Sequence, residues 1–93
     1  MKITYDSAKN ALNIQQRGLS FDRVAEFSFE TALITIDTRR DYKEIRYKAL
    51  GKLKGRVHCL IFTETTDGIR VISFRKANKR EVLLYEKNIS INS

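Results

Sequence analysis

The sequence predicts an α+β domain: a small, mostly antiparallel sheet of four to five strands with an N-terminal helical hairpin and a C-terminal helix. Short β-branched runs of alternating polarity recur between residues 32 and 74, separated by brief turns. Capping residues followed by apolar positions at helical spacing occur before this region and again after residue 77. The chain has 93 residues, 42% of them hydrophobic, and contains no proline, which suffices for a single domain over 1–93.

The N-terminal third is predicted to form a short strand and two helices. Residues 3–5 alternate between apolar and polar side chains, as a strand does. Asp6 or Ser7 can cap a helix that runs to about residue 17, and Gly18 can take the positive φ that ends it. Ser20 can cap a second helix. The apolar positions are Ala8, Ala11, Leu12 and Ile14 in the first helix, and Phe21, Val24, Ala25 and either Phe27 or Phe29 in the second.

Four strands joined by short turns should then form an antiparallel meander. They are expected at residues 32–36, 45–51, 57–63 and 69–74. The third of these is apolar on both faces, which is typical of a central strand packed on two sides. Asp67-Gly68 is the strongest turn dipeptide in the chain and leads into the last strand.

A final helix should follow the sheet. Asn78 and Glu81 have the spacing of a capping box, in which each side chain accepts a backbone hydrogen bond at the start of the helix. The helix is expected to end near Asn88, with the last five residues frayed.

Basic residues are concentrated in one part of the chain. Residues 46–80 contain ten Lys and Arg against Glu64 and Asp67, whereas residues 1–45 are electrically balanced. Such a region attracts polyanions, either nucleic acid or an acidic protein, although a basic surface can also serve solubility alone. The single cysteine and the lack of a long apolar run near Met1 favour a cytoplasmic protein that makes no membrane contact.

The candidate phosphate-binding residues lie in this basic region. They are Arg46, Lys48, Arg70, Arg75, Lys76, Lys79 and Arg80, with Glu64 nearby in the strand order. Strand side chains alternate, so Arg70 and Arg75 should lie on opposite faces unless the strand is bulged or ends before residue 75. The last part of the run should meet a helix N-terminus, whose N–H groups also attract anions.

His58 is the single histidine, and it is adjacent to Cys59. It can act as a proton-transfer group or simply be a partly buried strand residue. Neighbouring strand positions point to opposite faces, so these two side chains cannot share a metal. We expect Cys59 to be a small core residue, and we expect neither a metal site nor a cofactor.

Several segments resemble the BrnT family of type II toxins, which are small ribonucleases with a RelE/ParE-like fold. The similar segments are residues 5–9 together with Asn13, 17–21, 44–51, 55–58, 62–64 and, above all, 69–81, which read IRVISFRKANKRE. Two departures are Tyr5, where the family typically has Trp, and Arg17 before Gly18, where the family has His.

The resemblance implies a metal-independent endoribonuclease that is neutralised by a BrnA-like antitoxin and reaches operator DNA through that antitoxin. It implies RNA cleavage by attack of a 2′-hydroxyl on the neighbouring phosphate, with cationic side chains stabilising the transition state. On this reading Arg46, Arg70, Arg75, Glu64 and His58 are candidate catalytic residues. Lys48, Lys76, Lys79 and Arg80 are candidate RNA-binding residues.

Two other classes of protein remain open from the sequence. One is a catalytically inactive homologue that acts with an antitoxin in transcriptional autoregulation. The other is a plain nucleic-acid-binding module. Phe74 is the one aromatic residue within 69–81, whereas a surface on which bases stack usually has two or three.

Overall fold

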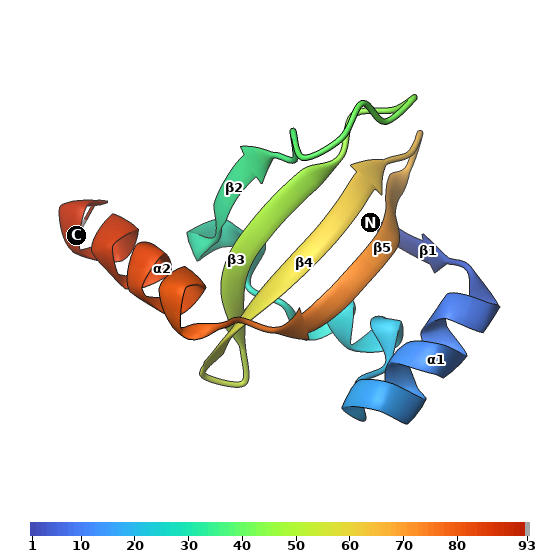
Figure 1. Cartoon of the computed structure of the whole chain (residues 1–93), viewed down its shortest axis with the longest axis horizontal. Coiled ribbons are helices and arrows are strands. Elements are labelled where there is room, and N and C mark those ends of the chain that lie inside the picture. The colour runs from blue at the N-terminus through green and yellow to red at the C-terminus, as the bar shows by residue number, and fades with distance from the viewer. Residues whose placement is uncertain (93) are drawn as a thin grey trace.

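The computed structural model describes residues 1–92 and contains a five-stranded mixed sheet with a helix at each end of the chain (Figure 1). This arrangement confirms the α+β class. The elements in chain order are β1 (Lys2–Tyr5), α1 (Ser7–Arg17), the 3-10 segments η1 (Phe21–Glu26) and η2 (Phe29–Thr31), β2 (Leu33–Ile36), β3 (Tyr47–Leu53), β4 (Arg56–Glu64), β5 (Gly68–Lys76) and α2 (Lys79–Asn92).

The sheet has the strand order β1-β5-β4-β3-β2. The predicted meander is confirmed, since β2, β3, β4 and β5 pair antiparallel in sequence order. β1 joins the edge of the sheet as a parallel neighbour of β5, in the register Lys2 opposite Gly68. A Cβ at Gly68 would collide with the backbone oxygen of Lys2, so glycine allows β1 to approach at this point.

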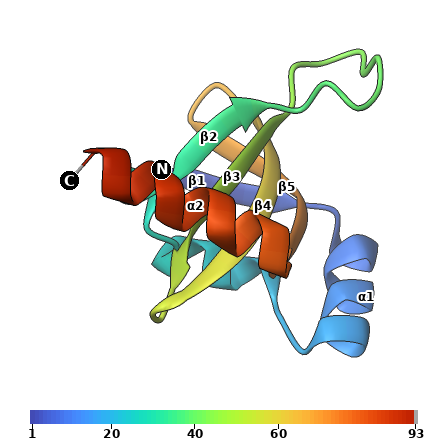
Figure 2. The same cartoon turned by 60° about the vertical axis from the view of Figure 1, so that its left-hand side comes forward.

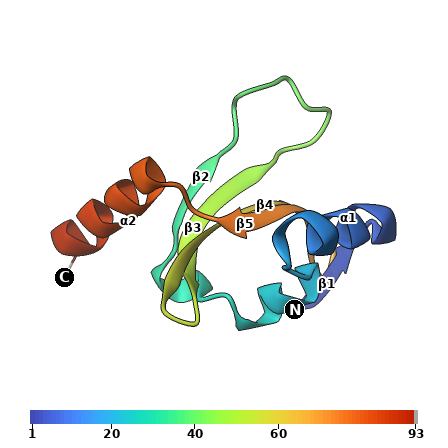
Figure 3. The ribbon, with the colours of Figure 1, turned by 60° about the horizontal axis from the view of Figure 1, so that its bottom comes forward.

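β4 is the centre of the molecule and is buried on both faces. One face, which we call the packed face, carries Leu60, Phe62 and Phe74 and is covered by η1 and its flanking residues. The other face carries Cys59 and Ile61 and packs against Tyr85 of α2. Figures 2 and 3 show α2 crossing this second face toward one end of the sheet, with the 3-10 segments on the other side. Helix α2 therefore leaves much of the second face uncovered.

The second predicted helix is instead two 3-10 segments. Ser20 does cap the first, because its hydroxyl accepts from the Asp22 amide at 3.2 Å. Phe21, Val24 and Phe27 are buried and are spaced by three residues. A 3-10 helix has three residues per turn, so this spacing aligns all three side chains toward the packed face, whereas an α-helix would spread them.

Helix α1 docks through a polar residue, which corrects the predicted apolar stripe. Leu12 and Ile14 are about half exposed, while Asn13 is the buried residue within Ser7–Arg17. The Asn13 side-chain amide donates to the backbone oxygens of Leu19 and Phe74, at 2.8 and 2.9 Å. β1 pairs with β5 only as far as Val71, so Asn13 satisfies a carbonyl on the free part of that edge.

Helix α2 begins with the predicted capping box. The Glu81 amide donates to Asn78 Oδ1 at 2.8 Å, and the Asn78 amide donates to Glu81 Oε1 at 2.9 Å. The predicted end near Asn88 is wrong for the described residues, because the helix continues to Asn92. Ser93 lies outside them. No helix in residues 1–92 has the length and apolar character that a membrane span requires.

Candidate functional site

A β-bulge in β5 brings Arg70 and Arg75 to the same face of the sheet. Ile61 of β4 pairs with Ser73, whereas the next residue, Phe62, pairs with Val71, so Ile72 is the extra residue of the bulge. Arg70 lies opposite Thr63, and Arg75 lies opposite Cys59. Thr63 and Cys59 share one face, so Arg70 and Arg75 share it as well. A bulge was one of the two ways in which these two side chains could lie on the same face. We call this face, which α2 partly covers, the arginine face.

Glu44 links two of the predicted arginines on this face. Its carboxylate accepts from Arg70 Nη2 at 2.8 Å to each oxygen and from Arg46 Nε at 3.2 Å. The Arg46 guanidinium also lies over the Tyr42 ring, 4.1 Å from its centroid. The Arg70 guanidinium, and then that of Arg46, holds the pKa of the Glu44 carboxyl below its usual value. Glu44 is therefore ionised at neutral pH and acts as an acceptor.

Backbone contacts hold the segment that carries Glu44 against the sheet. The Thr63 hydroxyl donates to the backbone oxygen of Ile45 at 2.8 Å. The Asp37 amide donates to the backbone oxygen of Arg46 at 2.8 Å. Thr63 belongs to β4 and Asp37 directly follows β2, so the segment is anchored on two strands. These anchors place Glu44 and Arg46 beside Arg70.

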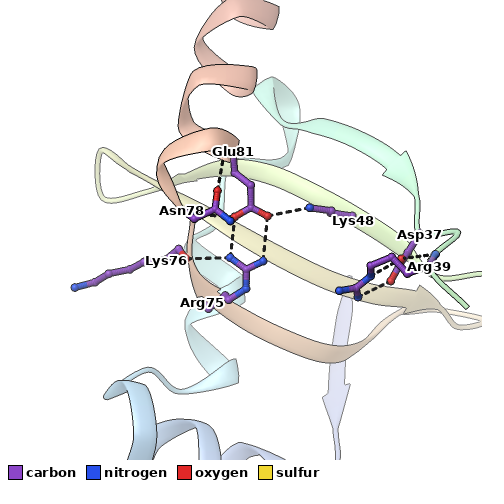
Figure 4. Close-up of polar contacts among 7 residues, drawn as sticks. All are labelled: Asp37, Arg39, Lys48, Arg75, Lys76, Asn78 and Glu81. Atoms are coloured by element: carbon purple, nitrogen blue, oxygen red, sulfur yellow. Dashed lines mark hydrogen bonds and ion pairs between the residues drawn. The ribbon is translucent and has the colours of Figure 1, made fainter.

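Glu81 organises a second cluster where α2 meets the arginine face (Figure 4). Its two oxygens accept from Arg75 Nη1 and Nη2 at 2.8 and 3.0 Å, and Lys48 Nζ lies 2.8 Å from Oε2. Glu81 is 5% exposed, so these contacts compensate a buried charge. Arg75 foremost, followed by Lys48 and the Asn78 amide, drives the pKa of the Glu81 carboxyl far below its usual value.

A third ion pair lies in the loop between β2 and β3. Arg39 donates to the buried Asp37 carboxylate through Nε at 2.9 Å and Nη2 at 2.8 Å, and the Tyr42 hydroxyl donates to it at 3.3 Å. Arg39 lowers the pKa of Asp37 to about 2. Glu81 raises the pKa of the Arg75 guanidinium, and the charge of Arg39 opposes this rise slightly, so the two guanidinium groups lie within electrostatic reach.

The arginine face thus combines five cations with three carboxylates. The cations are Arg39, Arg46, Lys48, Arg70 and Arg75, and the carboxylates are Asp37, Glu44 and Glu81. Each guanidinium has five N–H donors, so an arginine that chelates a carboxylate still has donors for an incoming anion. Cations held in place by such pairs are suited to binding phosphate and to stabilising charge that develops on it.

The structure places other predicted site residues elsewhere. His58 pairs with Gly51 and Lys76 and lies beside the Phe74 ring, on the packed face. Glu64 lies opposite Ile69 on that same face, where the Tyr47 hydroxyl donates to it and has its own pKa raised. These residues are therefore separated from Arg70 by the sheet, despite their proximity in strand order.

Two more predicted cations lie on α2. Lys79 and Arg80 are exposed in its first turn, next to the Glu81 cluster. Sequence reasoning missed three residues of the arginine face, namely Asp37, Arg39 and Glu44, which lie between the predicted strands 32–36 and 45–51. The signal that could have found Glu44 is its position two residues before Arg46, which allows one carboxylate to meet that arginine and a neighbouring strand.

Together the fold and the arginine face define a small α+β protein with a cluster of paired cations on one face of its sheet. A family model described as the ribonuclease toxin BrnT of type II toxin-antitoxin systems matches residues 5–81. The chain belongs to this family of ribonuclease toxins. Comparison with curated proteins and with solved structures gives no match.

Proposed function

We propose that this toxin cleaves RNA on the arginine face, with Arg46, Arg70 and Arg75 stabilising the transition state and Lys48 holding the strand. The observation that supports this most directly is the bulge at Ile72, which puts Arg70 and Arg75 on one face. Glu44 then joins Arg70 to Arg46, and Glu81 joins Arg75 to Lys48. We extend the proposal to a RelE/ParE-like fold, which the family resemblance implies.

The proposed reaction is an internal transfer of the phosphate within RNA. The 2′-oxygen forms a bond to phosphorus, the bond from phosphorus to the 5′-oxygen breaks, and the products are a cyclic phosphate and a 5′-hydroxyl end. The proton of the 2′-hydroxyl passes to Glu44, the ionised carboxylate beside Arg70, and the leaving oxygen takes a proton from water. The hydroxide that remains takes the proton back from Glu44, which restores the carboxylate. The arginines supply the charge stabilisation, so the reaction requires no metal ion.

His58, Glu64 and Lys76 have a different place in this proposal. They lie on the packed face, so direct contact with the same phosphate would require RNA to pass around the sheet edge. Their catalytic and binding roles stay predictions. Lys79 and Arg80 are proposed to hold RNA beside the Glu81 cluster, since they are exposed at the N-terminus of α2.

The experiment that tests this function is cleavage of a short single-stranded RNA by the purified toxin, with and without a chelator. We expect product ends that carry a cyclic phosphate and a 5′-hydroxyl, and an unchanged rate with chelator. Loss of cleavage in chelator would contradict the metal-independent mechanism. Binding of RNA without any cleavage would instead favour the inactive homologue.

The partner that we propose is an acidic, BrnA-like antitoxin that reaches operator DNA on behalf of the complex. A type II toxin has an antitoxin partner, and the charge of residues 46–80 favours acidic contacts. Replacement of Lys79 and Arg80 by Glu should weaken the complex and reduce its salt dependence. Lys87→Glu, an exposed change further along α2, is the control. Equal affinities of all variants for the antitoxin would show that it binds another surface of the toxin.

A further inference from the structure

A second basic site lies at the edge of the packed face and shares one residue, Arg75, with the arginine face. It is a pocket of about 610 Å³ between the end of α1, η1 and the hairpin that joins β3 to β4. Its cationic lining residues are Arg17, Arg23, Lys54, Arg56, Arg75 and Lys76. No Asp or Glu of the described chain lines it. Two carboxylates pair with the lining cations from outside the pocket: Glu26 lies 2.7 Å from Arg23 and 3.7 Å from Lys54, and Glu81 lies 2.8 Å from Arg75.

This pocket is continuous with the arginine face around the free edge of β5. β1 covers that edge only as far as Val71. Within residues 1–92 no strand pairs with the outer edge beyond it, where Asn13 instead bonds the Phe74 carbonyl. Arg75 lies at this free edge, since it lines the pocket and also chelates Glu81 on the arginine face. In Figure 4 the Lys76 side chain extends away from Glu81, on the other side of the strand from Arg75.

His58 forms part of the wall of the pocket and reports on its charge. Its Nδ1 lies 2.8 Å from the backbone oxygen of Arg56, and a carbonyl oxygen only accepts, so Nδ1 carries the proton. Burial first, and then the charges of Arg56, Lys76 and Arg23, lower the pKa of the ring. The ring is neutral at pH 7, and the cations around it would gain from an anion in the pocket.

We propose that this pocket binds a backbone phosphate of the RNA, on a nucleotide that flanks the one cleaved on the arginine face. The inference rests on the proposed function, because it takes RNA as the ligand. An RNA strand carries a negative charge on every nucleotide, so one strand can occupy both sites after turning around the edge at Arg75. No Phe, Tyr or Trp of the described residues lines the pocket, so it contacts the backbone without reading bases.

The test uses His58 as a spectroscopic probe, since it is the only histidine of the sequence. Its ring signal is followed by NMR across pH with a 2′-O-methyl RNA strand, which cannot undergo 2′-hydroxyl attack. We expect the signal to shift and the pKa of His58 to rise when the strand binds, because a phosphate offsets the neighbouring cations. A dinucleotide, which carries one phosphate between its two sugars, should produce a much smaller change at the same concentration.

A matched pair of variants assigns the effect to the pocket. Arg56→Gln removes a lining cation whose side chain makes no hydrogen bond or ion pair within residues 1–92. The substitution should flatten the salt dependence of RNA binding by about one unit. The control is Lys52→Gln, an exposed neighbour across the same hairpin that does not line the pocket. The control should retain the His58 response and the salt slope of the unmodified protein.

The possible outcomes separate this inference from the proposed function. If RNA is bound and cleaved but the His58 NMR signal does not shift, the pocket proposal is overturned and the proposed site on the arginine face is retained. If the His58 signal shifts with RNA but substitutions on the arginine face leave cleavage unaffected, phosphate binding in the pocket is supported and the proposed cleavage site is overturned. A response to an acidic peptide but not to RNA, or an equal response to inorganic phosphate, would also overturn the pocket proposal.

Discussion

The guanidinium of Arg75 and the carboxylate of Glu81 meet in two hydrogen bonds of 2.8 and 3.0 Å, which join the last strand of the sheet to the first turn of α2. The same carboxylate closes the capping box with Asn78 and pairs with Lys48 of β3. One side chain thus pairs with two cations of the arginine face and caps the start of the helix. A change at Glu81 should therefore alter both the stability of the fold and the charge of the arginine face.

Glu81→Ala should lower the free energy of unfolding by ~2–3 kcal/mol, through loss of the cap and exposure of two cations without a partner. The expected loss of unfolding free energy is smaller than for a fully buried ion pair, since the side chains of Arg75 and Lys48 are each about one third exposed. Urea denaturation measures the change. Glu81→Gln can keep the cap while removing the charge, so it should cost less. Equal stability of all three proteins would show that α2 is held by its apolar contacts alone.

The stability of the protein should fall with acid in two steps. The pKa of His58 is lowered in the folded protein, so the unfolded chain binds a proton first and stability declines as the pH falls below about 6.5. The pKa values of Glu81, Asp37 and Glu44 are also lowered. Their contribution is complete above about pH 4.5 and is lost as the pH falls further. Unfolding free energies measured across pH 3–8 check both steps.

The matched variant for the acid step is Glu81→Gln. It lacks the carboxylate with the most strongly lowered pKa, so its stability should depend less on pH below 4.5 than that of the unmodified protein. The step near pH 6.5 should be unaffected, because His58 lies on the opposite face of the sheet. Identical curves below pH 4.5 would mean that Glu81 has an ordinary pKa.

Arg70→Ala and Arg46→Ala should each slow single-turnover RNA cleavage by ~10²–10³ and weaken RNA binding much less. The reason is that charge on the phosphate is greatest in the transition state, where the arginines act. Glu44→Gln should also slow cleavage, and it should flatten the acidic limb of the pH profile if Glu44 takes the proton. Rates within twofold of the unmodified enzyme would remove a residue from the site.

Control substitutions for cleavage lie on the other face. Glu64→Gln keeps size and removes a charge from the packed face, where Glu64 contacts Tyr47. Its effect on the rate should be small if the arginine face alone does the chemistry. A loss as large as that of Glu44→Gln would restore Glu64 as the proton-transfer group. Circular dichroism of each variant confirms that the fold is retained.

Gly68→Ala should detach β1 from the sheet, because the new methyl group would overlap the Lys2 backbone. We expect a loss of several kcal/mol, as is usual when a backbone contact in a small domain must separate. Hydrogen exchange should show faster exchange at Ile3 and Tyr5 than in the unmodified protein. Thr66→Ala, in the same turn and exposed, serves as the control and should leave these rates unchanged.

The sequence predicted what depends on local pattern. Alternation located the four strands of the meander, and the Asn78–Glu81 spacing located the cap of α2. The parallel pairing of β1 with β5 was not accessible, because it joins residues more than sixty positions apart through backbone contacts. The 3-10 geometry of η1 was visible in the spacing of Phe21, Val24 and Phe27, although that spacing also allows an α-helix over a short segment.

The candidate site was predicted less completely, for a related reason. Arg46, Arg70 and Arg75 were identified by charge, but their common face depends on one extra residue at Ile72. Nothing in the composition of β5 marks which residue is bulged, since pairing with β4 decides it. Glu44 was missed because its role depends on how a loop folds back over the sheet, which local pattern does not encode.

The bulge also ties the arginine face to the pairing of β5 with β4. If β5 kept its length but paired as a regular ladder, the residues before Ile72 would move to the opposite faces. Ile69 and Val71 would turn outward and Arg70 would turn into the core. Loss of Ile72 itself would instead leave a regular strand in which Arg70 and Arg75 still share a face, so this stretch tolerates a shorter chain better than a straightened one.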